Sequence, residues 1–300
     1  MLQAEPAPGV LYLVATPIGN LGDLSPRARQ VLSNVDVIAC EDTRRSGLLL
    51  HQLGLRDRAE GIGARLISFH QHNQATRIPE LLAALQSGQS LAVVSDAGLP
   101  GISDPGEELV AAARAAGLMV ICVPGASAVT TALVSSGLPT GRFCFEGFLP
   151  AKASARRARL SELAAEPRTI VLFEAPHRLV DLLTDLLELL GDRPLRVARE
   201  LTKRHEEQVG PTVSAALAHF GQTPPQGECT LVLGGAAPQQ NPSWSEAELR
   251  RELEGLLAQG LSRREAARTL AERSGHSKRE LYALLHNGLS DGPHGGPSPQ

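Results

Sequence analysis

The sequence predicts an α/β protein made of two successive α/β domains and a small C-terminal helical segment. Over residues 10–235, short apolar runs alternate with stretches of helical periodicity, and Gly- or Pro-containing turns separate them. Aromatic residues make up only 3% of the chain although 42% of it is hydrophobic. Leu, Val, Ile and Ala must therefore build the core, as they do in parallel sheets covered by helices.

The first domain is predicted over residues 10–123, where strands and helices alternate. Ser25-Pro26 is typical of a helix start, with Ser as the N-cap and Pro at the first helical position. Further helices are expected over Ala75–Gln86 and from about Gly106. The expected strands are Val10–Ala15, Val35–Ala39, Arg65–Phe69, Leu91–Val94 and Met119–Val123. This alternation predicts a mostly parallel sheet.

The second domain is predicted over residues 124–235 and begins at the Pro124-Gly125 turn. A helix over Ala126–Ser136 opens it, and further helices are expected near 154–165, 177–190 and 212–220. The expected strands are Phe143–Phe145, Thr169–Phe173, Leu195–Ala198 and Cys229–Leu233. This domain is also α/β, with room for antiparallel strands at its end.

A Gly-, Pro- and Gln-rich linker over residues 234–242 precedes a helical segment at 243–287. Ser262 and Glu265 fit a capping box, and Ser277 and Glu280 fit a second one beyond the turn at Gly275. Two short capped helices separated by a glycine turn suggest a module like a helix-turn-helix. The tails, residues 1–9 and 288–300, are expected to be flexible.

Composition limits the function classes. The formal net charge is −3, so any nucleic-acid surface must be a local patch. The four cysteines lie in or beside apolar runs and form no CxxC or Cys/His cluster, so no metal site is expected. The N-terminus does not resemble a signal peptide, and no apolar run approaches the roughly 20 residues of a membrane span. We expect a cytoplasmic protein with no membrane contact.

The loop from Ser95 to Gly106 is the most informative segment. The apolar run Leu91–Val94 ends at Asp96, and three glycines, two prolines and Asp104 follow before a helix. In open α/β sheets, loops that follow buried parallel strands bind the ligand. Asp96, at the strand end, is the better candidate for a cofactor contact. Asp104 is expected to cap the following helix, with a substrate contact as the second interpretation.

Polar clusters follow several other predicted strands. Glu41–Arg45 is either a solvated turn or a site for phosphate and ribose. Ser127 lies either in a turn that joins the domains or at a ligand-binding helix N-terminus. In the second domain, Glu200 and Lys203 lie nearest a strand end. The basic stretch Lys152–Arg159 is either a contact for a polyanion or an exposed helix face.

Seven motifs in register resemble the ribosomal RNA small subunit methyltransferase I family, which is similar to tetrapyrrole methylases and diphthine synthases. The motifs are LYLVATPIGNLGDLSPRA, EDTRRSGLLL, VSDAGLPGISDPG, VPGASAVTTAL, FCFEGFLPAK, FEAPHRL and ARELTKRHEE. They cover residues 10–235 in consistent order. The segment Ser262–Glu272 is similar to the family's C-terminal helical part.

The resemblance implies two domains of the tetrapyrrole methylase (class III methyltransferase) type, with S-adenosylmethionine in the cleft between them and S-adenosylhomocysteine as the product. It implies a homodimer that methylates the ribose 2′-hydroxyl of a cytidine in the decoding region of 16S rRNA, within the 30S subunit. The loop Thr16–Asp23 departs from the glycine-rich GxGPGD-like loop of tetrapyrrole methylases, which favours RNA as the substrate. No metal is needed.

The resemblance also assigns site residues by position. Cofactor contacts are expected from Pro17, Ile18, Asp96, Leu99, Pro100, Gly101, Ser127, Ala128, Phe173, Ala198, Cys229 and Thr230. The residues themselves, apart from the resemblance, give a further hypothesis. Asp42, Glu200 and Lys203 lie on loops that can face the cleft, so one of them is expected to contact the 2′-hydroxyl. Contacts to the substrate RNA are expected from Asp23, Arg44, Arg45, Lys152, Arg156, Arg157 and Arg178.

Two alternatives stay open at this point. One is a methylase that acts on a tetrapyrrole or another small molecule. The other is a ligand-sensing nucleic-acid binder without enzymatic activity, for which the helical segment would contact the nucleic acid. Residues 243–287 contain eight Lys and Arg and seven Asp and Glu, a balance that does not favour strong binding to DNA by this segment alone.

Overall fold

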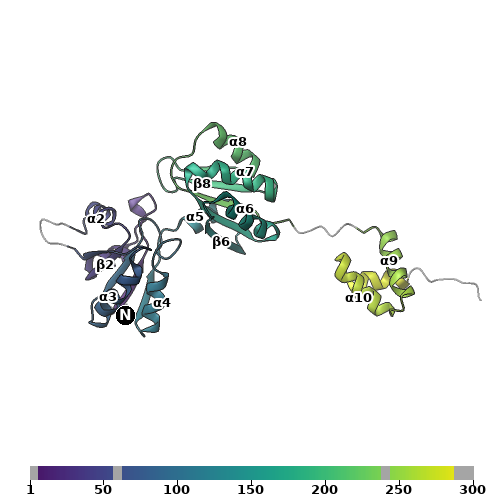
Figure 1. The fold of residues 1–300 in the computed structure, drawn as a ribbon, viewed down its shortest axis with the longest axis horizontal. Coiled ribbons are helices and arrows are strands. Elements are labelled where there is room, and N and C mark those ends of the chain that lie inside the picture. Colours follow the sequence, from purple (N-terminus) through teal and green to yellow (C-terminus); the bar gives the residue numbers. More distant parts are fainter. Residues whose placement is uncertain (1–5, 57–62, 238–243, 287–300) are drawn as a thin grey trace, which may run out of the picture. The chain divides into compact units, whose positions relative to one another are not determined.

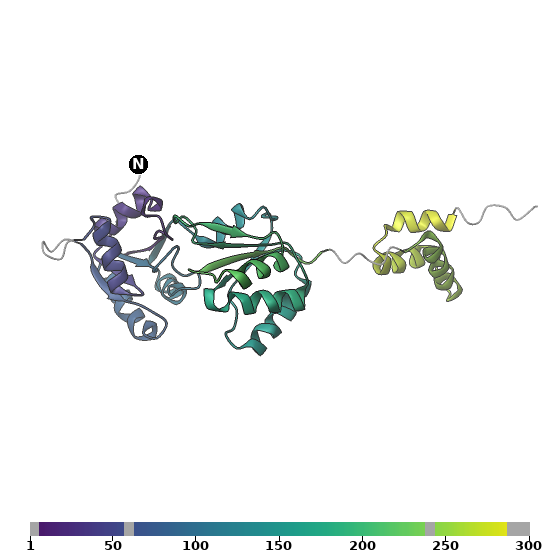
Figure 2. The same ribbon diagram turned by 90° about the horizontal axis from the view of Figure 1, so that it is seen from above.

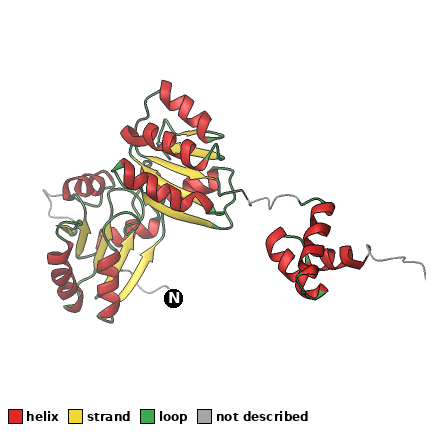
Figure 3. Cartoon of the chain, turned by 45° about the vertical axis from the view of Figure 1, so that its right-hand side comes forward, coloured by secondary structure: helices red, strands yellow, loops and turns green. Residues whose placement is uncertain are grey.

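A computed structural model describes residues 6–56, 63–237 and 244–286. The chain divides into two compact units, one up to Ala236 and one from Ala237 onwards (Figure 1). The first unit contains two five-stranded sheets, and the second is helical (Figure 3). Within the described ranges, no helix is both long and apolar enough to cross a membrane.

The first sheet is entirely parallel, as predicted. Its strand order is β3-β2-β4-β1-β5, so β4 returns between the first two strands of the chain. The strands are β1 (Val10–Val14), β2 (Val37–Cys40), β3 (Arg65–Ser68), β4 (Leu91–Val94) and β5 (Met119–Val123). Because all five run the same way, the loops after β1, β2, β4 and β5 leave from one edge of the sheet.

Helices cover both faces of this sheet. Tyr12 and Leu11, neighbours on β1, pack into the two cores on opposite faces, as strand geometry requires. The face of Tyr12 is covered by α1 (Pro26–Asn34) and α2 (Thr43–Gln52). The face of Leu11 is covered by α3 (Gln74–Gln86) and α4 (Glu107–Ala115). Ser25 caps α1 as expected, because its side chain accepts from the N–H of Ala28.

The second sheet is mixed, with strand order β6-β7-β10-β8-β9. The strands are β6 (Phe143–Phe148), β7 (Thr169–Glu174), β8 (Leu195–Arg199), β9 (Glu207–Val209) and β10 (Cys229–Leu233). Only β6 and β7 pair in parallel, and β10 runs antiparallel to both of its neighbours. This confirms the expected room for antiparallel strands. The sequence did not predict β9, which is only three residues long.

The helices of the second half lie on both faces of its sheet (Figure 2). One face is covered by α6 (Ala153–Glu162), α7 (Leu179–Leu190) and α8 (Val213–Gln222). The other face packs against α5 (Ala128–Ser135), through Val129, Ala132 and Leu133. The short 3-10 helices are η1 (Leu21–Asp23), η2 (Leu163–Ala165) and η3 (Pro176–Arg178). The domain limits 10–123 and 124–235 stay predictions.

The C-terminal unit has three described helices, one more than the expected pair: α9 (Glu246–Ala258), α10 (Arg263–Ser274) and α11 (Lys278–His286). The expected capping boxes at Ser262 and Ser277 are both present. Gly275 ends α10 with φ 73°, the left-handed region that favours glycine. The helices share a core of Leu and Ala side chains. The segment limits 243–287 stay predictions.

The two predicted tails are only partly described. Residues 1–5 and 288–300 lie outside the described residues. In the remaining part of the N-terminal tail, the N–H of Ala7 donates to the hydroxyl of Tyr12 at 2.9 Å. Ala7 also packs against the core on the Tyr12 face of the first sheet. This short stretch is therefore attached to β1.

Candidate active site

The strand ends of both sheets line one cavity of about 560 Å³. Loops after β2, β4 and β5 supply one wall, and the ends of β6, β7, β8 and the start of β10 supply the other. This volume is in the range of pockets that bury a small ligand. The cavity is the place where the sequence predicted a cleft at the carboxyl ends of the strands.

Strand register brings the second-sheet residues together. Thr230 on β10 pairs with Phe173 on β7 and with Ala198 on β8, so the three residues form a row across the sheet. Phe173, Cys229 and Thr230 line the cavity. Ala198 is 1% exposed and packs in the core behind the cavity instead. Burial raises the pKa of the Cys229 thiol to about 12, so this cysteine is a neutral lining group.

Backbone pairing joins the loops after β1 and β4. The N–H groups of Thr16 and Gly98 donate to each other's carbonyls at 2.9 and 3.0 Å. Ile18 and Leu99 consequently lie in the cavity wall. Pro17 lies beside them, in a smaller adjoining cavity that Asp96 also lines. Pro100 and Gly101 are absent from the cavity wall.

Asp96 has the most informative side chain of the first-sheet wall. Its Oδ2 accepts a 2.8 Å hydrogen bond from Arg45, whereas its Oδ1 is buried and has no partner. A buried carboxylate oxygen without a partner costs free energy unless a ligand donates to it. Ser127, the N-cap of α5, also lines the cavity, and its side chain makes no capping hydrogen bond. The N–H groups of the first turn of α5 are therefore available to a ligand.

The cavity lining is acidic. The lining contains two cations, Arg45 and Lys203, and the carboxylates of five residues. Those five are Glu41, Asp96, Asp104, Glu200 and Glu228. Such a lining favours a cationic ligand, and the apolar Ile18, Leu99 and Phe173 offer surfaces for a flat ring. The donor set therefore fits S-adenosylmethionine, which has a sulfonium, an ammonium, a ribose and an adenine.

The loop after β8 is held in an unusual backbone conformation. Glu200 and Thr202 have φ values of 53° and 66°, a region that residues other than glycine rarely adopt. The Lys203 ammonium lies 2.8 Å from Glu200 Oε1. A Cβ on Gly227, whose φ is +73°, would lie 2.1 Å from that same oxygen. The N–H of Asn20 also donates to the Thr202 hydroxyl at 3.0 Å, which joins the loops of the two halves.

Asp104 does not cap α4, so that expectation is wrong. The helix begins after Gly106 without any side-chain cap, and Asp104 lines the cavity. Burial raises the pKa of its carboxyl to about 6, and the neighbouring acid Glu41 adds to the shift. The loop Ser103–Gly106 turns through two positive φ values, 60° at Ser103 and 147° at Gly106, and Gly106 instead of Asp104 is the N-cap residue of α4.

Asp42 lies outside the cavity wall, and its neighbour Glu41 lies in it. Asp42 is the N-cap of α2 and accepts from the backbone N–H of Arg44 at 2.8 Å. The Arg44 side chain also bonds to Asp42, which lowers the pKa of that carboxyl. The sequence reading missed α2, because the Asp-Thr start of the helix was interpreted as part of a charged loop.

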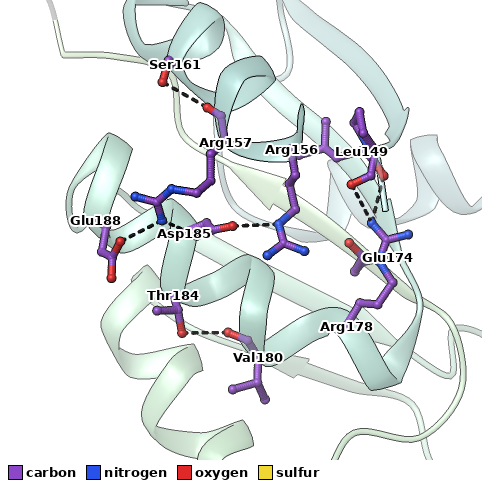
Figure 4. Close-up of polar contacts among 11 residues, drawn as sticks. Leu149, Arg156, Arg157, Ser161, Glu174, Arg178, Val180, Thr184, Asp185 and Glu188 are labelled. Atoms are coloured by element: carbon purple, nitrogen blue, oxygen red, sulfur yellow. Dashed lines mark hydrogen bonds and ion pairs between the residues drawn. The ribbon is translucent and has the colours of Figure 1, made fainter. Parts of the chain in front are cut away.

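The basic stretch of α6 is paired internally, and the RNA contact predicted for Arg156 is wrong. Arg156 is 5% exposed, and its Nε donates to Asp185 at 2.7 Å (Figure 4). Arg157 pairs with Asp185 and Glu188. These acids come from α7, which lies against α6, and sequence spacing gave no sign of them.

Arg178 is also engaged inside the protein. Its Nη2 donates to the carbonyl of Leu149 at 2.8 Å, and its Nε lies 3.1 Å from the buried Glu174 (Figure 4). Arg178 therefore fixes the loop that follows β6. Among the other residues assigned to RNA, Arg45 lines the cavity, whereas Asp23, Arg44 and Lys152 are exposed outside it.

Several lining residues were missed by the sequence analysis. They are Ala97, Gly98, Ile102, Ser103, Val129, Phe148, Leu201, Gly227 and Glu228. Glu228 directly adjoins β10, and that position was the available signal. Glu41, which belongs to the predicted Glu41–Arg45 cluster, does line the cavity. Among the described residues, no cluster of three or more His, Cys, Asp or Glu side chains is arranged to bind a metal ion.

Comparison with known proteins identifies the family. Residues 10–218 match the family model of tetrapyrrole (corrin/porphyrin) methylases. A relative from Synechocystis sp., named ribosomal RNA small subunit methyltransferase I, is 53% identical over 95% of this chain and 100% of its own length. The chain belongs to the ribosomal RNA small subunit methyltransferase I family. A member from Escherichia coli O157:H7 is 45% identical over 93% of this chain and 95% of its own length.

Solved structures agree with this family on the fold. Uroporphyrin-III-C-methyltransferase from Thermus thermophilus matches with a TM-score of 0.52 and 24% identity, over 75% of this chain and 94% of that chain. Diphthine synthase matches with a TM-score of 0.56 and 13% identity, over 75% of this chain and 90% of that chain. The predicted class III methyltransferase fold is confirmed, and the chain is a methyltransferase of this family.

Proposed function

We propose that the protein transfers a methyl group from S-adenosylmethionine to the ribose 2′-hydroxyl of a cytidine in the decoding region of 16S rRNA. The relatives that span nearly the whole chain are named as methyltransferases of small subunit ribosomal RNA. The main structural support is the acidic cavity, which Asp96 and Asp104 both line. Oδ1 of Asp96 is buried without a hydrogen-bond partner, and the pKa of the Asp104 carboxyl is raised to about 6.

Residues of both halves are proposed to hold the cofactor. Asp96 accepts from the ribose hydroxyls or the ammonium, and the first-turn N–H groups after Ser127 bind the carboxylate. Ile18, Leu99 and Phe173 flank the adenine. Ala128, Cys229 and Thr230 complete the wall. When bound, S-adenosylmethionine supplies a methyl group on a sulfonium that is its own leaving group.

Asp104 is proposed to accept the proton of the 2′-hydroxyl. A carboxylate whose pKa is raised to about 6 is a stronger base than an ordinary aspartate and is still ionised at neutral pH. It replaces Asp42 in this role, because Asp42 lies outside the cavity wall. Glu200 and Lys203 are paired with each other at the opposite wall, where we propose that they contact the ribose of the substrate nucleotide.

A tetrapyrrole substrate is less compatible with this cavity. Tetrapyrroles that are methylated in biosynthesis are polycarboxylates, and the carboxylates of five residues in the lining repel such a molecule. An RNA strand can present one uncharged ribose hydroxyl to the cavity while its phosphates stay outside. A ligand sensor without enzymatic activity does not account for relatives over nearly the whole chain that are named as methyltransferases.

We further propose that the protein works as a cytoplasmic homodimer on the 30S subunit. β5 is an edge strand of the first sheet, and Met119 on it is 56% exposed. Val134 on α5 is 71% exposed. Exposed edges and apolar side chains of this kind favour coverage by a second copy. Light scattering is expected to give twice the chain mass of 31.7 kDa, and a monomer at micromolar concentration would contradict this.

Labelled S-adenosylmethionine tests the proposed substrate class. The protein is incubated with 30S subunits, with protein-free 16S rRNA and with uroporphyrinogen III in parallel. We expect label in RNA and none in the tetrapyrrole. The comparison of 30S subunits with free rRNA decides which of them is the substrate. Transfer to the tetrapyrrole alone would contradict the proposal.

A further inference from the structure

The described part of the C-terminal unit contains a basic groove of about 680 Å³, lined by residues of α10 and α11. Arg264 and Arg268 lie one helical turn apart on α10, so they point to the same side. Lys278 and Arg279 are the first two residues of α11. Tyr282, also on α11, completes the groove and is 41% exposed.

The four cations of this groove make no hydrogen bond or ion pair with another side chain in the described part of the unit. The unit does pair other cations. Arg250 bonds to Glu246 at 2.8 Å, and Arg273 bonds to Glu252 at 3.1 Å and lies over the ring of Trp244. All four groove cations are therefore exposed, and none is held by a hydrogen bond or ion pair to a side chain of the described residues.

Glu265, the acid of the groove, is already engaged. Its carboxylate accepts from the N–H and the hydroxyl of Ser262 at 2.9 and 2.7 Å, in the capping box of α10. Glu248 and Glu280 are engaged in the same way at the starts of the other two helices. Three of the seven acids of the unit are thus used in capping boxes, and four of its eight cations line the groove.

The active-site cavity cannot attract a polyanion, because its lining is acidic. A protein of net charge −3 that acts on RNA needs a separate cationic surface. The groove combines four exposed cations with an exposed aromatic ring, the two groups with which proteins bind phosphates and stack unpaired bases.

We infer that the groove between α10 and α11 binds the phosphodiester backbone of the substrate RNA, with Tyr282 placed to stack on an unpaired base. This inference rests on the proposed function and adds a substrate-docking site remote in sequence from the active site. In it, Arg264, Arg268, Lys278 and Arg279 bind RNA, in place of the internally paired arginines of α6.

A matched pair of double variants in the full-length protein tests this assignment. Arg268→Ala with Arg279→Ala removes two groove cations. Arg251→Ala with Arg263→Ala removes two exposed cations of the same unit that do not line the groove. Fluorescence anisotropy measures binding of a labelled RNA with the sequence of the 16S decoding region, over a series of salt concentrations. Thermal melting checks that both variants fold.

The groove variant is expected to bind the RNA roughly tenfold more weakly, with a salt dependence whose slope is smaller by about 1.5. The control variant is expected to change both values little. In methyl transfer, the groove variant should raise KM for RNA and leave kcat and the affinity for S-adenosylmethionine unchanged. If the groove variant fails to fold, Arg264→Ala with Lys278→Ala replaces it in the same measurements.

Equal RNA affinity and equal salt slope in the groove and control variants would overturn the inference. Weaker binding to 30S subunits with unchanged binding to protein-free RNA would also overturn it, because the groove would then contact a ribosomal protein. Failure of the proposed function is a different result. In that case the wild type transfers no methyl group to RNA, whatever the groove variant does in the binding experiment.

Discussion

The guanidinium of Arg45 donates a 2.8 Å hydrogen bond to Oδ2 of Asp96 and thereby joins the first turn of α2 to the loop that follows β4. The side chain of Asp96 is 23% exposed, whereas that of Arg45 is 73% exposed. Arg45 thus fixes the carboxylate from the solvent side, and Oδ1 stays buried without a partner. This geometry makes Asp96 the most specific acceptor that the cavity offers to a cofactor.

Replacement of Asp96 by Asn is expected to weaken the binding of S-adenosylmethionine. The amide keeps the shape but loses the charge that attracts an ammonium or strengthens a hydrogen bond. A charged hydrogen bond contributes about 2 kcal/mol, so the Kd should rise roughly thirtyfold in calorimetric titration. Asp42→Asn is the control, since Asp42 lies outside the cavity wall. Equal affinity of Asp96→Asn and wild type would remove Asp96 from the cofactor site.

Replacement of Asp104 by Asn is expected to lower kcat by roughly 10² to 10⁴, the usual contribution of a general base. Because the pKa of Asp104 is about 6, the wild-type rate should rise with pH through about 6 and level off above it. The variant should lack this rise. Single-turnover methylation at a series of pH values measures both effects. A variant with wild-type kcat and the same pH profile would exclude Asp104 as the base.

The raised pKa of Asp104 also predicts how stability changes with pH. The folded protein binds this proton more tightly than the unfolded chain, in which the pKa is near 3.8. The free energy of unfolding should therefore fall as pH rises from about 4 to about 6. Asp104→Asn keeps the neutral form, so it should exceed wild type by about 1–2 kcal/mol at pH 7, after allowance for partial exposure.

Urea unfolding at pH 4 and pH 7 measures this difference. The stability difference between Asp104→Asn and wild type should be present at pH 7 and nearly absent at pH 4. A variant that is less stable than wild type at pH 7 would contradict the assigned direction of the shift.

Replacement of Arg156 by Ala is expected to destabilise the fold and to leave RNA binding unchanged. The change leaves Asp185 buried with Arg157 as its remaining partner. Loss of one partner of a buried ion pair costs about 3 kcal/mol in urea unfolding. Lys152→Ala, at an exposed position of the same segment, should cost nearly nothing. If Arg156→Ala raised KM for RNA without any loss of stability, Arg156 would contact RNA after all, and this prediction would be wrong.

Much of the first unit could be predicted because its strands are short apolar runs between clear helix and turn signals. All five strands of the parallel sheet were predicted, and the N-cap at Ser25 is confirmed. The helix α2 was missed, because Thr43–Arg45 reads as a charged loop unless Asp42 is recognised as its cap. β9 was missed because three residues in a charged stretch have no distinct periodicity.

The residues of the site were harder to predict than its location. The end of a predicted strand shows where a residue lies along the chain, but it does not show in which direction the side chain points. Asp42 and Glu41 are neighbours, but the start of α2 turns Asp42 to the helix and leaves Glu41 in the cavity. Arg156 looks like a surface cation in the sequence, since Asp185 lies 29 residues away on another helix. Such pairings depend on tertiary packing, which local patterns do not contain.

Nucleoside mass spectrometry of 16S rRNA after reaction with the wild-type protein locates the transferred methyl group and so tests the proposed reaction. The RNA is digested with nucleases after incubation with isotope-labelled S-adenosylmethionine, and the labelled methyl group is located within the fragments. We expect one labelled methyl group on the ribose of a cytidine in the decoding region. Label on a base, or RNA without label, would contradict it.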